Sequence, residues 1–350
     1  MARIIGKGYS YDDVLIIPKY NTIQSRKDVS FKTKVTKNYS IDTPFVIPDM
    51  DSVSESTMAI TIGKLGGLGQ IHRFLTIEEQ VSQLKKVQEA GILVAAAVGV
   101  KDVKERVPKL AQAGIKILIL DISHAHSKMA GEALEWIKSV YPRIDVMVGN
   151  IATKEAAEYF MKKGADAIKI GVGPGSMCTT RIMTGAGVPQ ITAIMNAFEA
   201  TQGKIPICAD GGIKYPGDVV KAIGAGADTV MIGSVISGTD ECPGEIIVKD
   251  GKKYKEYRGM ASYDATLRRK KLGGESSEVI SVEGERTLVE CKGPVEQIIK
   301  KFLGGLASGM TYQGASKIDD FKGKSDFIEM SPQGLNESHA HNGGNKIIRN

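Results

Sequence analysis

Short apolar runs recur through the first two thirds of the sequence, and they constrain the fold more than any other feature. Segments with helical periodicity separate them, and a spacing of about 20 to 40 residues leaves room for a strand, a loop and a returning helix. Strands that alternate with helices form parallel sheets with right-handed crossovers. Eight such units favour a closed (β/α)8 barrel, the TIM barrel, over an open sheet. The runs are 44–48, 68–72, 93–98, 115–120, 145–148, 167–170, 205–209 and 228–232.

Composition excludes several classes of protein. The chain has 350 residues, 42% of them hydrophobic and 25% charged, as expected for a globular protein with a sizeable core. No apolar run approaches the roughly 20 residues that span a bilayer, and the first residues contain no secretory segment. The 4 cysteines have neither CxxC spacing nor a disulfide pattern, which favours the cytoplasm. A net charge of +6 without basic-aromatic interleaving predicts no nucleic-acid surface.

The segment Gly171–Arg181, here called the cysteine loop, follows the sixth apolar run. Three glycines and a proline within residues 171–175 require a tight turn. Their N–H groups can approach an anion closely, and Ser176 adds a hydroxyl. Cys178 follows, near Arg181, where a cation and free N–H groups favour a thiolate. Two interpretations remain open from the residues: Cys178 is a nucleophile, or it is a small buried hydrophobic residue.

A polar residue follows nearly every predicted strand. The carboxyl ends of barrel strands converge on one face, where active sites are built, although a single polar residue can simply cap the next helix. The loops after the seventh and eighth strands are the usual phosphate site of this fold. There, Gly212, Gly233 and Ser234 would hold a phosphate together with Ser176. Asp210 would accept hydrogen bonds from the ribose hydroxyls. The polar residues at the strand ends are Asp49, Asp51, His72, Asp121, Asn150, Cys178, Asp210 and Ser234.

The periodic pattern breaks after the eighth run, at a flap insertion of about residues 239–293. It contains a predicted hairpin, 245–254, in which Asp250-Gly251 suits a tight turn. Residues 268–277 are basic and then rich in glycine and serine, which is typical of a lid or of disorder. Their basic cluster is either a solvated face or an attractor of phosphorylated ligands. We expect one barrel domain over residues 1–350 that carries this insertion.

Helix ends and the last part of the chain give weaker signals. Gly114, Gly164 and Gly224 are predicted to lie just past helices. A final helix is predicted from Pro294 to about Leu303. The segment of about residues 321–350 is polar, and its two neighbouring histidines can bind metal, but a flexible tail is the expected structure. These histidines are His339 and His341.

Four motifs resemble the IMP dehydrogenase/GMP reductase family over about residues 11–341. They are the cysteine loop, Asp210-Gly-Gly212, Tyr257-Arg-Gly-Met260 and Gly304-Gly305. The resemblance implies a (β/α)8 barrel in a homotetramer and a purine mononucleotide, GMP or IMP, bound by its phosphate. It also implies that Cys178 attacks C2 of the purine while a nicotinamide ring stacks on the base. Many members carry regulatory CBS modules between the second and third units, but residues 84–94 run directly from helix into strand, so this module is absent.

Two activities of that family must be separated. The dehydrogenase oxidises IMP with NAD, and an Arg-Tyr pair of its flap activates water. The reductase converts GMP to IMP and ammonia with NADPH and needs no such pair. No Arg-Tyr pair occurs between Met260 and Glu283, which favours the reductase, whereas Met50–Glu55 and 334–339 look more like the dehydrogenase. A nucleotide-binding protein without catalysis is the third hypothesis.

The resemblance also implies roles for individual residues. Cys178 is the nucleophile, and Thr180 with Glu283 transfers a proton, because a hydroxyl bonded to a carboxylate can relay one. Without the resemblance, Glu283 is interpreted as a surface carboxylate. A potassium ion would bind the carbonyls of Gly173, Gly175 and Cys178. The further substrate-binding residues are Met50, Tyr257, Gly259 and Met260, and the cofactor-binding residues are Asp121, Ser123, Asn150, Gly171 and Gly173.

Overall fold

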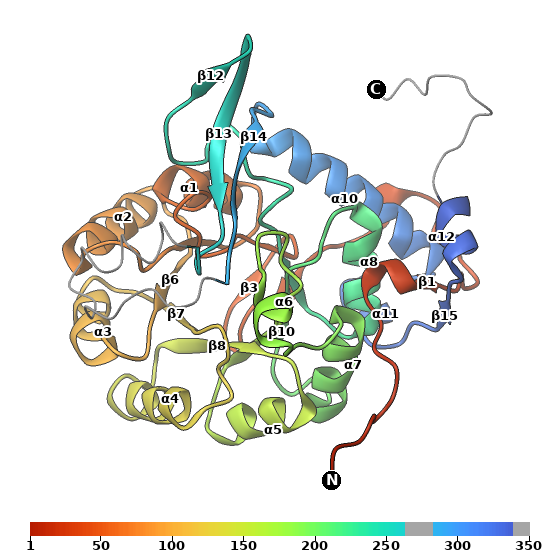
Figure 1. Ribbon diagram of the computed structural model, residues 1–350, viewed down its shortest axis with the longest axis horizontal. Coiled ribbons are helices and arrows are strands. Elements are labelled where there is room, and N and C mark those ends of the chain that lie inside the picture. The colour runs from red at the N-terminus through yellow and green to blue at the C-terminus, as the bar shows by residue number, and fades with distance from the viewer. Residues whose placement is uncertain (263–282, 339–350) are drawn as a thin grey trace.

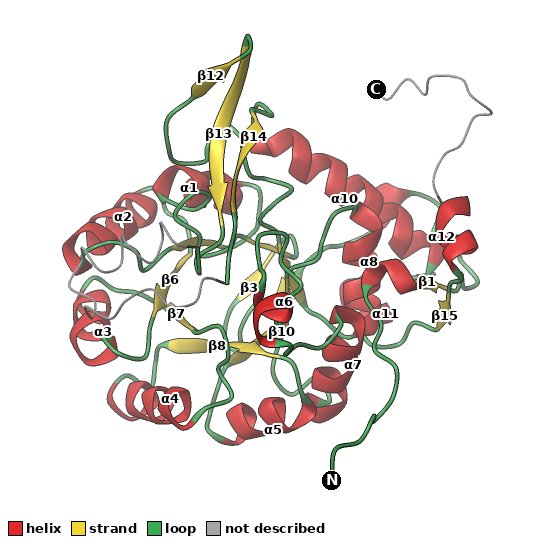
Figure 2. Ribbon diagram, viewed as in Figure 1, coloured by secondary structure: helices red, strands yellow, loops and turns green. Residues whose placement is uncertain are grey.

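A ring of parallel strands forms the centre of the computed structural model, which describes residues 1–262 and 283–338 (Figures 1 and 2). The strands are β4 (Phe45–Val46), β5 (Gly69–Ile71), β6 (Val94–Val98), β7 (Ile117–Asp121), β8 (Asp145–Ile151), β9 (Ala167–Ile170), β10 (Ile207–Asp210) and β11 (Thr229–Met231). Their order in the 8-stranded sheet is β4-β11-β10-β9-β8-β7-β6-β5. A parallel bridge between Val46 and Leu68 closes the ring. The structure therefore confirms the (β/α)8 barrel and each predicted strand.

Amphipathic helices surround the barrel, each burying its apolar face against the strands. They are α1 (Ser56–Lys64), α2 (Ile77–Glu89), α3 (Val103–Gln112), α4 (Lys128–Val140), α5 (Lys154–Lys162), α7 (Gln190–Thr201), α8 (Pro216–Ala225) and α10 (Val295–Tyr312). Thr76 and Glu79 cap α2 reciprocally at 3.1 and 2.8 Å. Since α2 ends at Glu89 and β6 begins at Val94, no regulatory module separates the second and third units.

The end of the barrel at which the strands begin is filled by apolar side chains. One buried cluster takes a residue from every barrel strand or its immediate flank, together with Ile41 of the hairpin β2 (Thr33–Lys34) and β3 (Ser40–Ile41). Cys208 belongs to this cluster, and burial raises the pKa of its thiol to about 12. It is therefore an inert core residue. Polar side chains are left to the opposite end, where the strands terminate.

Two predictions about glycines and helices were wrong. Helix α10 does not end near Leu303 but continues through Gly304 and Gly305 to Tyr312. A Cβ at Gly305 would lie 2.2 Å from Pro216 of α8, so glycine lets the two helices pack closely. Gly224 lies inside α8, and Gly226, with φ of 126°, follows the helix end instead. Gly114 and Gly164, with φ of 81° and 88°, do follow their helices.

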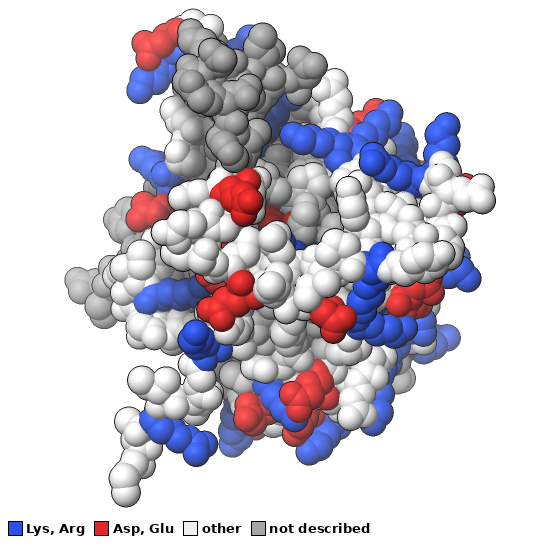
Figure 3. Space-filling view, turned by 90° about the vertical axis from the view of Figure 1, so that its right-hand side faces the viewer, with Lys and Arg blue, Asp and Glu red and all other residues white. Residues whose placement is uncertain are grey.

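The expected flexible tail is wrong for residues up to 338. After α11 (Ile318–Phe321), strand β15 (Phe327–Glu329) pairs antiparallel with β1 (Val14–Ile16), and α12 (Pro332–Glu337) follows. His339 and His341 lie outside the described residues. Among the residues described, no helix is both long and apolar enough to cross a membrane. Basic and acidic side chains are interspersed on the face seen in Figure 3.

The flap insertion carries a three-stranded antiparallel sheet, here called the flap sheet. It consists of β12 (Ile247–Lys249), β13 (Lys252–Arg258) and β14 (Arg286–Glu290). Asp250 and Gly251, with φ of 51° and 72°, form the tight turn between β12 and β13, which confirms the predicted hairpin. Figure 1 shows this sheet projecting beyond the barrel. The basic segment 268–277 lies outside the described residues.

Candidate active site

The cysteine loop leaves β9 and crosses the end of β10. A Cβ at Gly171, whose φ is 152°, would lie 2.1 Å from the carbonyl oxygen of Asp210, so the crossing requires glycine. Cys178 is only partly buried, unlike Cys208, and its thiol donates to the Thr180 hydroxyl at 3.0 Å. The interpretation of Cys178 as a buried hydrophobic residue is therefore wrong. Thr180 begins the short helix α6 (Thr180–Thr184).

Arg181 contacts backbone carbonyls instead of the thiol. Its Nε donates to Val172 at 3.2 Å and its Nη2 to Val188 at 2.7 Å. The guanidinium therefore braces the cysteine loop. The expectation that this cation lies against the sulfur is not met.

Glu283 reaches the cysteine loop through backbone pairing. The Thr179 N–H donates to the Glu283 carbonyl at 3.1 Å, and Cys178 and Gly284 form an antiparallel bridge. The Thr180 hydroxyl donates to the Glu283 carboxylate at 2.8 Å. Thiol, hydroxyl and carboxylate are thus linked in a row, so Glu283 is not a free surface carboxylate. Such a row can move a proton between a bound ligand and the carboxylate.

The predicted phosphate residues come together where three loops meet. The hydroxyls of Ser176 and Tyr257 are 3.4 Å apart, and a Cβ at Gly233 would lie 3.3 Å from the Tyr257 oxygen. Burial raises the pKa of Tyr257, so this residue keeps its proton. Gly212, with φ of 82°, lies against the same loop, where its Cβ would be 3.7 Å from Pro174.

The turn after β11, residues 233–242, adds backbone donors to this meeting point. The N–H groups of Ile236 and Ser237 donate to the Gly233 carbonyl at 3.1 and 2.9 Å, which winds the turn into a helical shape. The N–H groups of Ser234 and Val235 have no acceptor among the described residues. Free N–H groups at the start of a helical turn favour an anion.

The predicted residues just after β13 and in the loop after β4 lie at the same meeting point of loops. The Met50 sulfur lies 3.6 Å from the position of a Cβ at Gly233, and the Met260 sulfur accepts from the Asp51 N–H at 3.4 Å. A Cβ at Gly259 would lie 3.0 Å from the Met177 carbonyl. All of the proposed substrate-binding residues therefore surround one region of the barrel mouth.

Lys169 is a central residue that sequence reasoning missed. Its side chain is 2% exposed, and its ammonium contacts Asp121 and Asp210 at 3.0 Å each and also Asn150. Asn150 in turn donates to Asp210 at 2.8 Å and to the Gly171 carbonyl at 2.7 Å. Lys169 joins the side chains that we predicted on the nucleotide and cofactor sides. A lysine in the middle of an apolar strand was the signal in the sequence.

Two neighbouring carboxyl groups in this network differ in charge. Burial and the nearby Asp121 raise the pKa of Asp49 to about 8, so Asp49 is protonated at neutral pH. Burial opposes the ionised form of Asp121, but Lys169 and Arg73 outweigh it and lower the pKa of Asp121. Ser123, predicted to bind the cofactor, lies exposed in the loop that follows Asp121.

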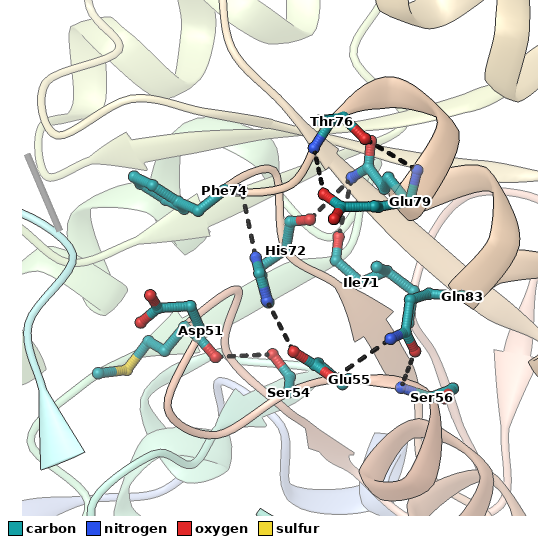
Figure 4. A network of polar contacts seen from close by, with 12 residues as sticks. Asp51, Ser54, Glu55, Ser56, Ile71, His72, Phe74, Thr76, Glu79 and Gln83 are labelled. Carbon is teal, nitrogen blue, oxygen red and sulfur yellow. Dashed lines mark hydrogen bonds and ion pairs between the residues drawn. The ribbon is translucent and has the colours of Figure 1, made fainter. Parts of the chain in front are cut away.

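His72 is fully buried and contacts residues of the neighbouring loops (Figure 4). Its Nδ1 accepts the N–H of Phe74 at 3.2 Å, and its Nε2 lies 3.8 Å from the Glu55 carboxylate. Glu55 also accepts from Gln83 of α2 at 3.2 Å. These contacts hold the loops after β4 and β5 together, so we interpret His72 as a structural residue of the barrel mouth.

A partly buried thiol, a hydroxyl–carboxylate pair and a turn with free N–H groups lie together at the carboxyl ends of these strands, the usual place for the active site of a (β/α)8-barrel enzyme. Residues 8–341 match the sequence model of the IMP dehydrogenase / GMP reductase domain. The chain belongs to this family, whose members are oxidoreductases that use NAD(P) nucleotides.

Relatives of both kinds cover nearly the whole chain. Inosine-5'-monophosphate dehydrogenase of Borreliella burgdorferi is 39% identical over 97% of this chain and 98% of its own length. GMP reductase of Leishmania donovani is 32% identical, with 96% and 97% covered. Among solved structures, a cysteine-to-alanine variant of GMP reductase from Trypanosoma brucei in complex with guanosine 5'-monophosphate has a TM-score of 0.90 and 31% identity, with 97% and 98% covered. Overall identity therefore does not choose between the two activities.

Proposed function

We propose that the protein is a GMP reductase that converts GMP to IMP and ammonia with NADPH. The observation that carries this proposal is the 2.8 Å hydrogen bond from Thr180 to Glu283, next to the Cys178 thiol. Departure of an amino group from C2 needs a proton, and a hydroxyl bonded to a carboxylate can deliver it. The sequence between Met260 and Glu283 also lacks the Arg-Tyr pair that would activate water.

In the proposed reaction the thiolate of Cys178 adds to C2 of GMP. Thr180 and Glu283 pass a proton to the amino group, the C–N bond breaks and ammonia leaves. A hydride from bound NADPH would then add to C2, the C–S bond would break, and IMP, NADP⁺ and the free thiolate would remain. Splitting one difficult substitution into these steps is the advantage of covalent catalysis.

The remaining residues would bind and orient the two nucleotides. The phosphate would lie on the turn after β11 and on Ser176 and Gly212, with Asp210 on the ribose. The nicotinamide end of the co-substrate would face the row of residues on the other side of Lys169. These are Asp121, Ser123, Asn150, Gly171 and Gly173.

IMP dehydrogenase with NAD is the second candidate, favoured by the 39% identity to the Borreliella burgdorferi enzyme. Purified protein should be assayed in parallel with GMP plus NADPH and with IMP plus NAD. NADPH oxidation that depends on GMP supports the reductase. NADH formation from IMP without that oxidation refutes it. Turnover in neither direction, with nucleotide binding kept in Cys178→Ala, would instead support a binding protein without catalysis.

We also propose a homotetramer and a potassium ion on the cysteine loop. The carbonyl of Gly175 accepts the Cys178 N–H at 3.0 Å and keeps a second lone pair, so it fits as one ligand beside the carbonyls of Gly173 and Cys178. Sedimentation gives the oligomeric state. Replacing K⁺ with choline at constant ionic strength should lower activity if the ion is required.

A further inference from the structure

Lys255 is a buried lysine of β13 that the proposed reaction does not use. The residue is 5% exposed, and its ammonium donates to three carbonyl oxygens of the turn after β11. The acceptors are Thr239 at 3.0 Å, Asp240 at 3.1 Å and Cys242 at 2.7 Å. These bonds use all three N–H donors of the ammonium. Within residues 1–262 and 283–338, no carboxylate forms an ion pair with it.

This arrangement satisfies the hydrogen bonds of Lys255 but leaves its charge without a paired carboxylate in the part of the chain that the structure describes. A buried ammonium is costly unless it is both hydrogen-bonded and paired with an anion. The carbonyls are neutral, so they meet only the first requirement. An anion bound close by would meet the second.

The proposed phosphate site is close to Lys255 along β13. Lys255 and Tyr257 point to the same buried face of the strand, where two residues span about 7 Å. The Tyr257 hydroxyl lies 3.4 Å from Ser176 and near Gly233. The buried charge and the candidate phosphate residues therefore belong to the same packed unit.

A second lysine orients the same turn. The Lys292 ammonium, just after β14, donates to the carbonyls of Ser234 at 3.0 Å and Val235 at 3.2 Å. Because C=O and N–H point in opposite directions across a trans peptide, the Val235 N–H is directed away from Lys292. Strand β13 and the segment after β14 thus hold the carbonyl side of the turn and leave N–H groups free for an anion.

We propose that Lys255 is a positioning residue for the nucleotide phosphate: its ammonium fixes the turn after β11 and supplies a buried charge that balances the phosphate dianion. The proposal rests on the proposed binding of a purine nucleotide. In this proposal Lys255 makes the protein prefer nucleotides over nucleosides, although its side chain does not need to touch the phosphate.

The test compares binding of GMP and guanosine by calorimetry. Lys255→Met keeps the length of the side chain and removes the charge, so the affinity for GMP should fall about tenfold or more, while that for guanosine changes less than about twofold. Lys253→Met, on the same face of β13 but exposed, is the matched control and should bind both as the wild type does. Unchanged GMP affinity, or equal losses for both ligands, overturns the proposal.

A second variant covers the case in which Lys255→Met does not fold. Lys255→Ala removes three carbons and the ammonium, and n-propylammonium carries the same atoms. Added propylammonium should restore GMP affinity in Lys255→Ala and leave the wild type unchanged; no recovery overturns the proposal. If the wild type binds neither GMP nor IMP, the proposed function itself fails, whereas normal wild-type binding with an unaffected Lys255→Met removes only the role of Lys255.

Discussion

Replacing Glu283 with glutamine tests the proton-transfer pair with little change in shape. The backbone contact from Thr179 to Glu283 remains, so the flap insertion stays in place. An amide oxygen can still accept the 2.8 Å bond from Thr180, and weakening a charge-assisted bond to a neutral one costs about 1 kcal/mol, roughly a fivefold effect. Loss of proton transfer is larger, about 10²–10⁴-fold. We therefore expect kcat for GMP and NADPH to fall by about 10²–10⁴ with GMP affinity nearly unchanged.

The leaving group separates proton transfer from structural damage. In 2-chloroinosine 5′-monophosphate the group at C2 departs as chloride and needs no proton. The Glu283→Gln enzyme should therefore catalyse the NADPH-dependent reduction of this substrate at close to the wild-type rate. NADPH absorbance follows both reactions. Glu285→Gln is the control, because Glu285 lies exposed on the same returning segment. Equal losses for the amino and chloro substrates, or more than half of the wild-type activity with GMP, would refute the role of Glu283.

Three further predictions concern stability and binding. In α10, Gly305→Ala should lower the free energy of unfolding by about 1–3 kcal/mol, because the new Cβ clashes with α8. Gly304 has open space around it, so Gly304→Ala should raise the free energy of unfolding by about 0.5–1 kcal/mol. Thermal unfolding of the two variants compares these effects. Tyr257→Phe should raise KM for GMP about threefold to tenfold without changing kcat, as steady-state kinetics will check, because the hydroxyl beside Ser176 is lost. The pKa of Asp49 is raised from 3.8 to about 8, so its contribution to stability is present below its unfolded pKa and is lost as pH rises through about 8. Asp49→Asn should remove that loss. Melting temperatures of the wild type and the variant, measured from pH 3.8 to above pH 8, will show it.

Local patterns predicted the barrel well because each unit carries its own signal. A short apolar run, a glycine and a capped amphipathic helix repeat along the chain, and the contacts between successive units are close in sequence. The same holds for the cysteine loop, whose tight turn depends on Gly171 and its neighbours. Lys169 was missed because a polar residue in an apolar strand was interpreted as part of the apolar pattern.

Tertiary packing determined what local patterns did not predict. Glycine disfavours helices, so Gly304-Gly305 indicated an end to α10, yet close packing on α8 requires glycine at position 305. Strand β15 pairs with β1, which lies near the other end of the chain, and local sequence patterns do not predict a pairing over such a separation. Glu283 and Thr180 are separated by 103 residues, and only the family resemblance predicted their contact.

In the mechanism proposed above, the way in which Glu283 is supplied explains how one fold can serve two activities. Cys178 and Thr180 come from the cysteine loop, which is fastened to the barrel, and Lys169 locks Asp121 and Asp210 below it. The carboxylate comes from the flap insertion, where the short pairing of residues 283–285 with residues 177–179 places it against the Thr180 hydroxyl beside the thiol. A change in the flap insertion can therefore alter what activates the leaving group or the attacking water and leave the nucleophile in place. Activity within this family is for that reason better inferred from this segment than from identity over the whole chain.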